Sequence, residues 1–100
     1  MDIEKKFNEE RCDVEIKGYV DTVASIELER VLSSIPEQVT RIVMDLSAVG
    51  YIGSSGLRVL HAAHKEMVSR DGSIELRKVP ELVMKVLETT GFSKTLLIIP

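Results

Sequence analysis

The stretch from Ile42 to Met67 most constrains what this chain can fold into. It begins with a short apolar run that ends at Asp45, continues through a segment with three glycines, and then changes to a helical pattern. A strand, a tight loop and a helix in this order are typical of an α/β unit. Two serines, Ser54 and Ser55, stand where the helix is expected to begin, and a helix N-terminus favours anions. The stretch therefore predicts a hydroxyl group placed where a phosphate can be held.

The residues before this stretch predict two strands and a helix. A weak, edge-like strand around residues 3–7 is followed by an alternating strand that ends at Val20. Asp21 or Thr22 is expected to cap a helix that Pro36 closes. The apolar stripe of this helix comprises Ala24, Leu28, Val31, Leu32 and Ile35. Val23 and Ile26 lie off the stripe and are expected to face outward.

The central strand is expected over residues 41–45, with Asp45 and Ser47 forming the turn after it. The helix that follows should end at Ser69. Its apolar side is expected to carry Leu57, Leu60, Ala63, His64, Met67 and Val68. A short strand is expected over residues 73–77, a third helix from Pro80 to Gly91, and a last strand over residues 96–99.

This order, β-β-α-β-α-β-α-β, predicts a mixed central β-sheet with helices packed on it. The length suits one α/β domain over residues 1–100.

Composition narrows the classes of function. The net charge is −3 and no cluster of Lys and Arg exists, so no nucleic-acid surface is expected. The longest apolar run, residues 96–99, is far too short to span a bilayer, and no secretory signal starts the chain. Cys12 is the only cysteine, which excludes an internal disulfide. We therefore expect a cytoplasmic protein that is a monomer when free, with no cofactor, no metal and no membrane partner.

The two serines admit two interpretations. One of them could simply cap the helix, which is a common role for serine at that position. Alternatively, one caps and the other is a regulated hydroxyl, since a phosphate adds roughly −1.5 to −2 charges at pH 7. A helix N-terminus tolerates such an anion, favouring it by ~0.3–1 kcal/mol. An unpaired charge forced into a desolvated contact costs several kcal/mol. Phosphorylation would then spare the fold and disrupt an interface.

Enzymatic alternatives have less support. A hydrolase elbow needs Gly-x-Ser-x-Gly, which neither serine matches. His61 and His64 lie six and nine residues after Ser55, about 9 Å or more along a helix, so neither reaches its hydroxyl. We expect His61 in solvent and His64 packed. The glycines are not followed by Lys-Ser/Thr, as a phosphate-binding loop requires, so nucleotide binding has only weak support.

Asp21 also has two interpretations. It could cap the first helix. Because parallel strands end at the same edge of a sheet, it could instead lie near Ser55. A carboxylate there could hold Mg²⁺ during phosphoryl transfer or repel the product phosphate.

Three segments of the sequence resemble the STAS domain family, as found in bacterial anti-sigma factor antagonists. They are Asp45-Leu46-Ser47-x-Val49-x-x-Ile52-x-Ser54-Ser55-Gly56-Leu57, Gly18-Tyr19-Val20-Asp21 with Ala24, and Leu87-x-x-Thr90-Gly91-Phe92. The resemblance covers roughly residues 12–97 and implies a mixed sheet with helices packed on it.

The resemblance implies a partner-switching role. It implies that Ser55 is phosphorylated by a serine kinase of the histidine-kinase-like ATPase type. That kinase is also the anti-sigma factor or another sequestering partner, and a PPM-type phosphatase resets the modified serine. It places partner contacts at Asp21, Thr22, Val23, Gly53, Ser54, Ser55, Gly56, Arg58 and Ala62, with Ile26 beside them. Phosphorylated members usually carry Asp where this chain has Gly53. A second hypothesis is therefore a STAS module that associates constitutively, as a scaffold or transporter-associated subunit.

Overall fold

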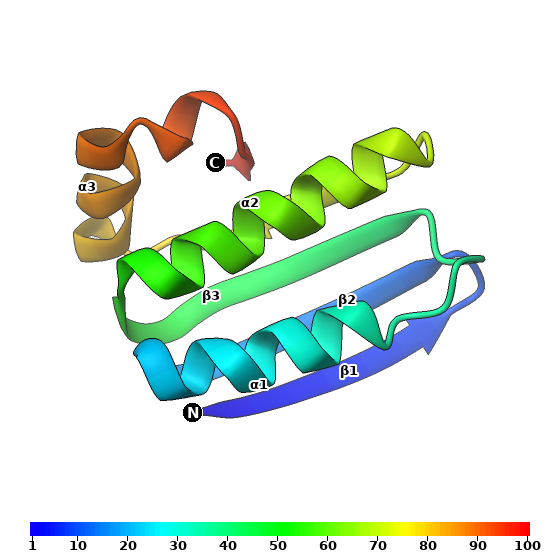
Figure 1. Ribbon diagram of the computed structural model, residues 1–100, viewed down its shortest axis with the longest axis horizontal. Coiled ribbons are helices and arrows are strands. Elements are labelled where there is room, and N and C mark those ends of the chain that lie inside the picture. The colour runs from blue at the N-terminus through cyan, green and yellow to red at the C-terminus, as the bar shows by residue number, and fades with distance from the viewer.

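A five-stranded mixed sheet forms the centre of the structure, a computed structural model that describes residues 1–100 (Figure 1). The strands are β1 (Asp2–Asn8), β2 (Arg11–Val20), β3 (Arg41–Ile52), β4 (Ser73–Arg77) and β5 (Leu97–Ile99). The helices are α1 (Thr22–Ser33), α2 (Ser54–Ser69), α3 (Glu81–Thr90) and the 3₁₀ turn η1 (Phe92–Lys94). The strands are ordered β1 to β5 across the sheet; β1 pairs antiparallel with β2 and the others are parallel. The predicted fold is confirmed, with η1 added.

Helices α1 and α2 lie side by side over one face of the sheet (Figure 1). Alternate residues of β2 point into this layer, and Cys12, Val14 and Ile16 are all buried. From the helix layer, Leu28 of α1 and Leu60 of α2 pack into the same core. The apolar stripe predicted for the first helix is thus confirmed, although the helix ends at Ser33 and Ile35 is buried just beyond it.

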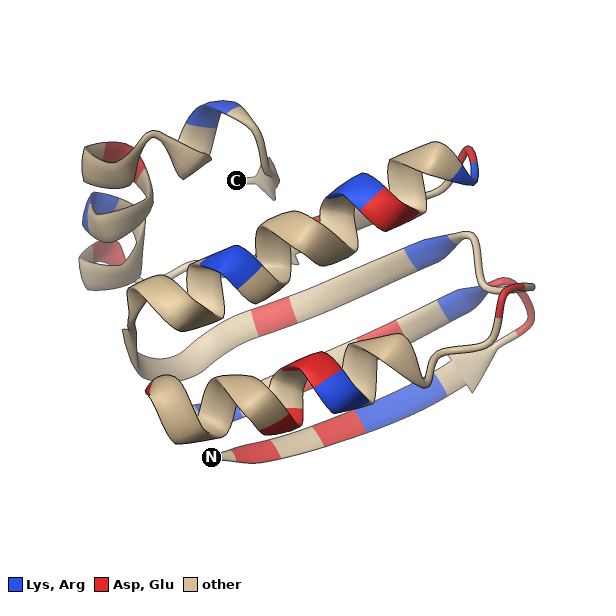
Figure 2. Ribbon diagram, in the orientation of Figure 1, with Lys and Arg blue, Asp and Glu red and all other residues tan.

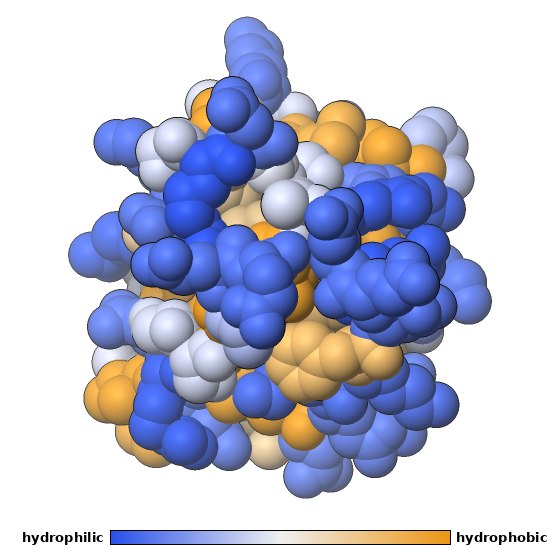
Figure 3. Space-filling view, turned by 90° about the vertical axis from the view of Figure 1, so that its right-hand side faces the viewer, coloured by the Kyte–Doolittle hydropathy of each residue, from blue (hydrophilic) through white to orange (hydrophobic).

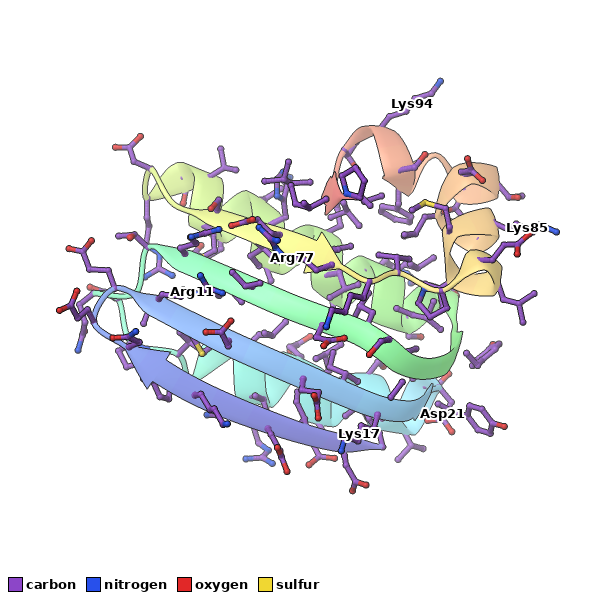
Figure 4. The ribbon with its side chains drawn as sticks, turned by 180° about the vertical axis from the view of Figure 1, so that it is seen from behind. Arg11, Lys17, Asp21, Arg77, Lys85 and Lys94 are labelled. Carbon is purple, nitrogen blue, oxygen red and sulfur yellow. The ribbon has the colours of Figure 1, made fainter.

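The opposite face of the sheet has no helix in front of it; we call it the open face (Figure 4). Charged side chains cover it, among them Arg11, which bonds Asp13 at 2.8 Å. At its centre Glu75 is only 6% exposed and lies between Arg41 and Arg77, both of which donate hydrogen bonds to it. The bonds from Arg41 and then Arg77 outweigh the effect of burial and lower the pKa of Glu75 to about 2.

Strand β3 is much longer than predicted, because it continues through Ile52 instead of ending at Asp45. Its pairing with β2 shifts register twice, between Glu15 and Lys17 and between Gly18 and Tyr19 of β2. In each shift β3 contributes one extra residue, which is a β-bulge. Asp45 does accept a bond from the Ser47 backbone N–H, at 2.8 Å, but the bond lies at the first bulge and not in a turn after the strand.

The remaining elements occur where the sequence predicts them, but the start of α3 and the environment of two side chains of α2 differ from the prediction. Pro80, expected in the first turn of the third helix, instead precedes α3 as its N-cap. Gly91 ends that helix with a left-handed φ of 83°, as predicted. Val68, expected on the apolar side of α2, is instead 53% exposed. His61, expected in solvent, is half-buried with its ring edge-on to that of Phe92, 5.4 Å between centroids. None of the helices is both long enough and apolar enough to cross a membrane.

Candidate functional site

The candidate site lies at the edge of the sheet where β2 and β3 end and α1 and α2 begin; we call it the carboxyl edge (left in Figure 1). Val20 and Ile52 are register partners at the ends of the two strands, and the backbone N–H of Gly53 bonds the Val20 carbonyl at 3.0 Å. This bond ties the start of α2 to the start of α1. Asp21 and the Gly53–Ser55 segment are therefore brought to the same edge, as the sequence predicted for parallel strands.

Neither serine caps α2, which corrects both interpretations drawn from the sequence. The N-cap is Gly53, in an extended conformation (φ −93°, ψ 177°), and no side chain bonds the free N–H groups of the first turn. Ser54 is exposed and its hydroxyl accepts a bond from Arg58 at 3.3 Å. Ser55 is half-buried in the first turn. Its hydroxyl has no structural task in capping.

The first turn of α2 presents free backbone donors. The first hydrogen bond of the helix runs from the Leu57 N–H to the Gly53 carbonyl, at 3.1 Å. The N–H groups of Ser54, Ser55 and Gly56 precede it and have no acceptor within the helix. Free N–H groups and the helix dipole together favour an anion at this end. A phosphate on Ser55 would therefore be compatible with the fold.

Gly56 supports the site from below. It is buried, and a Cβ at this position would lie 2.8 Å from Cγ1 of Val20 and 3.0 Å from Cγ1 of Ile52. The absence of a side chain allows α2 to approach the ends of both strands closely. The resemblance placed Gly56 among the partner contacts, but the structure buries it. Gly56 lies beneath Ser55 and holds the first turn of α2 in position.

The other predicted residues lie on α1 and further along α2. Asp21 accepts a bond from the Ala24 N–H at 2.8 Å and is the N-cap of α1. Thr22 is exposed, and Val23 and Ile26 are 77% and 70% exposed, as the stripe predicted. The structure contains no group of three or more His, Cys, Asp and Glu residues arranged to hold a metal ion.

Ala62 lies apart from the others, two turns beyond Ser55 on α2. It is exposed and lines a groove of about 420 Å³ between α1 and α2, together with Val59 and Glu29. The groove continues away from the carboxyl edge toward Arg70 at the other end of α2.

Two tyrosines at the carboxyl edge were missed by the sequence reasoning. Tyr19 and Tyr51 are register partners on β2 and β3 and are 67% and 53% exposed. Leu82, 70% exposed in the first turn of α3, follows the end of β4. A large side chain next to the end of a predicted strand could have indicated such a surface residue. For Tyr51 this signal was missing, because the bulges interrupt the alternating pattern by which the strand would have been predicted.

Comparison with known proteins gives consistent results. A profile of the STAS domain family matches residues 2–100. The anti-sigma-B factor antagonist of Bacillus subtilis (strain 168) is 28% identical over 91 residues, which covers 91% of this chain and 84% of that protein. Since the family match spans nearly the whole chain, it includes every element that builds the carboxyl edge.

Solved structures share the fold. The anti-sigma factor antagonist SpoIIAA in its unphosphorylated form superimposes with a TM-score of 0.80 at 17% identity, over 99% of this chain and 88% of that one. Its phosphorylated form gives 0.77. The STAS domain of a SulP transporter from Vibrio cholerae gives 0.71 at 19% identity, over 95% of this chain and 77% of that one. At these identities the likeness concerns the fold, and together with the family match it shows that this chain belongs to the STAS domain family.

Proposed function

We propose that this protein is a phosphorylation-switched anti-sigma factor antagonist and not an enzyme. In the unmodified form it binds an anti-sigma factor and thereby releases the sigma factor. That partner is also a serine kinase of the histidine-kinase-like ATPase type, and phosphorylation of Ser55 abolishes binding. A PPM-type phosphatase restores the unmodified form. The placement of the protein in the cytoplasm, free of nucleic acid and membrane, is part of the same proposal.

The observation that carries the proposal is the position of Ser55. Its hydroxyl stands in the first turn of α2, beside free backbone N–H groups and at the edge where α1 also begins. The helix end favours an anion by ~0.3–1 kcal/mol, so phosphorylation should leave the domain folded. The same charge within a desolvated interface costs several kcal/mol, and about 2.7 kcal/mol already changes affinity a hundredfold.

The relatives support the same role. The Bacillus subtilis relative is named for antagonism of an anti-sigma factor, and SpoIIAA has been solved in unphosphorylated and phosphorylated forms. The two forms superimpose on this chain almost equally well, with TM-scores of 0.80 and 0.77. If phosphorylation leaves the fold intact, the phosphorylated and unphosphorylated forms should resemble this chain equally well.

The test uses the purified chain, its cognate ATPase-type kinase, and ATP. We expect the mass to increase by one phosphate and Ser55→Ala to abolish the increase. Ser54→Ala is the matched control, since Ser54 is the neighbouring and more exposed hydroxyl, and it should still be modified. Modification of Ser55→Ala would refute the assignment of the site.

A second candidate is constitutive association, without phosphorylation. Two observations favour it: the N-cap Gly53 offers no carboxylate beside Ser55, and a transporter STAS domain shares the fold. The two candidates differ in their response to Ser55→Glu. The switch predicts a loss of affinity of about a hundredfold with an unchanged melting temperature. Constitutive association predicts equal binding by the variant and the wild type.

A further inference from the structure

We propose that Tyr19 and Tyr51 form an aromatic surface, the tyrosine platform, that determines which protein partner binds at Ser55. We further propose that this partner presents an uncharged, apolar surface to it. The inference rests on the proposed function in one respect, because it concerns the same partner. It adds what that partner must look like and which residues recognise it.

The platform is built on two glycines. An added Cβ at Gly50 would lie 2.7 Å from Cε1 of Tyr19, so the ring of Tyr19 lies directly against the backbone of residue 50. An added Cβ at Gly53 would lie 3.0 Å from the hydroxyl oxygen of Tyr51. Tyr51 therefore reaches from the end of β3 to the N-cap of α2, two residues before Ser55. Each glycine leaves room for one tyrosine.

The two tyrosines are neighbours in the sheet, because Tyr19 and Tyr51 are register partners on adjacent parallel strands. Both remain more than half exposed although each lies against the backbone. The first two turns of α1 add Val23 and Ile26 at the same edge, so four of the eight large apolar side chains that the protein exposes belong to it. Tyrosine is enriched in protein–protein interfaces and at their hot spots.

The carboxyl edge carries little charge, which restricts the kind of partner that it fits. No Asp, Glu, Lys, Arg or His occurs from residue 46 to residue 57, and residues 18–26 include only Asp21 (Figure 2). The carboxylate of Asp21 already accepts the Ala24 N–H. Away from Asp21 and Arg58, a charged group of a partner would be desolvated here without a counter-charge, which is unfavourable. An apolar surface loses nothing of this kind and gains contact with the rings.

The chain offers an unusually direct probe, since these are its only two tyrosines and it has no tryptophan. Labelling with 3-fluorotyrosine yields two ¹⁹F resonances, assigned with Tyr19→Phe and Tyr51→Phe. On addition of the cognate ATPase-type anti-sigma factor, both resonances should shift. In parallel, Tyr19→Ala and Tyr51→Ala should each weaken binding at least about tenfold.

Two further sets of variants separate the platform from general effects. Gly50→Ala keeps both rings but displaces that of Tyr19, so it should also weaken binding while the melting temperature is unchanged. Phe7→Ala and Val68→Ala remove apolar side chains that are 51% and 53% exposed away from this edge, and should bind as the wild type does. Raising the salt concentration tenfold should change affinity less than about threefold, since no charge pair contributes.

The outcomes distinguish this inference from the proposed function. If Ser55→Glu abolishes binding while both tyrosine variants bind normally, the platform is refuted and the switch stands. If the tyrosine variants lose affinity while Ser55→Glu binds normally, the platform stands and the switch is refuted. Resonances that shift with protein concentration alone would show a second copy of the chain on the platform and overturn the inference, as would a steep fall in affinity with salt.

Discussion

The carboxyl edge and the open face of the sheet are surfaces of opposite character. The edge is uncharged over long stretches of sequence and exposes tyrosines and aliphatic side chains. The open face carries ion pairs on β2, β3 and β4, centred on the nearly buried Glu75 (Figure 4). The end opposite the carboxyl edge is mostly hydrophilic as well, with apolar atoms only in separate patches (Figure 3). Of these three surfaces, the carboxyl edge is the one with long uncharged stretches of sequence, and it carries Ser55.

The difference supports the proposed phosphorylation switch at Ser55. On the open face, one more charge would find partners among many others and change little. At the carboxyl edge the only Lys or Arg nearby on α2 is Arg58, which already bonds Ser54. A new charge of roughly −2 therefore changes the character of the whole edge. The contrast also predicts that the edge depends on close packing and the open face on ion pairing.

The largest effect is expected at Gly56. Its buried position leaves no room for a side chain, with Val20 and Ile52 within 3.0 Å of an added Cβ. Gly56→Val should lower the free energy of unfolding by about 3 kcal/mol, the upper range of overpacking. Urea denaturation measures this directly. Ala62→Val, an exposed position on the same helix, is the control and should change stability by less than about 0.5 kcal/mol. Equal effects at both positions would contradict the packing account of the edge.

The next effect tests ion pairing on the open face. Glu75→Gln leaves Arg41 and Arg77 without their carboxylate and should lower stability at pH 7 by about 1–3 kcal/mol. We expect less than the full cost of breaking a buried pair, because both arginines are about 40% exposed and can be hydrated. Glu15→Gln, which removes an exposed pair with Lys17, is the control and should cost less than about 1 kcal/mol.

The same carboxylate sets a dependence on pH. Its pKa is about 2 in the folded protein and near 4.5 otherwise, so the folded state binds fewer protons between these values. Its contribution to stability is complete above about pH 4.5 and is lost as the pH falls toward 2. The stability of Glu75→Gln should therefore fall less steeply over this range. If the variant and the wild type lose stability equally steeply as the pH falls, Glu75 is not the group responsible for the pH dependence.

Sequence reasoning recovered the element order and the location of the site but not the length of β3. The ends of α2 and β4 were predicted well because serine, glycine and the apolar period mark them plainly. In β3 the bulges place Leu46, Val49 and Ile52 in the core at intervals of three residues, not two. This spacing does not match the period of a strand, so the sequence pattern predicts a loop for this segment. The tyrosine platform was lost for the same reason, since it depends on the register between β2 and β3.

A smaller effect is expected at Asp21, where two roles were left open. Asp21→Ala removes the N-cap of α1 and should lower stability by about 1 kcal/mol, measured by thermal unfolding. Asp21→Asn keeps a capping oxygen and removes only the charge. If Asp21 serves as a cap alone, the Asn variant should be phosphorylated at the wild-type rate. A large loss of rate in Asp21→Asn, with stability intact, would instead assign the carboxylate to phosphoryl transfer.

The smallest change in stability, and the sharpest test of the contrast, is Gly53→Asp. Gly53 already has the extended conformation of an N-cap, and α2 lacks a capping side chain, so the carboxylate should stabilise the domain by a few tenths of a kcal/mol. The new side chain must also displace the Tyr51 hydroxyl and adds a charge to the uncharged edge. We therefore expect the affinity of the unphosphorylated variant for its partner to fall about tenfold, a loss near 1.4 kcal/mol, while the melting temperature rises slightly.

Gly53→Ala is the control, because it displaces Tyr51 without adding charge, and the difference between the two variants isolates the effect of the charge. A gain of affinity in Gly53→Asp would mean that the partner carries a cation opposite residue 53, and the uncharged edge would then not be what the partner recognises.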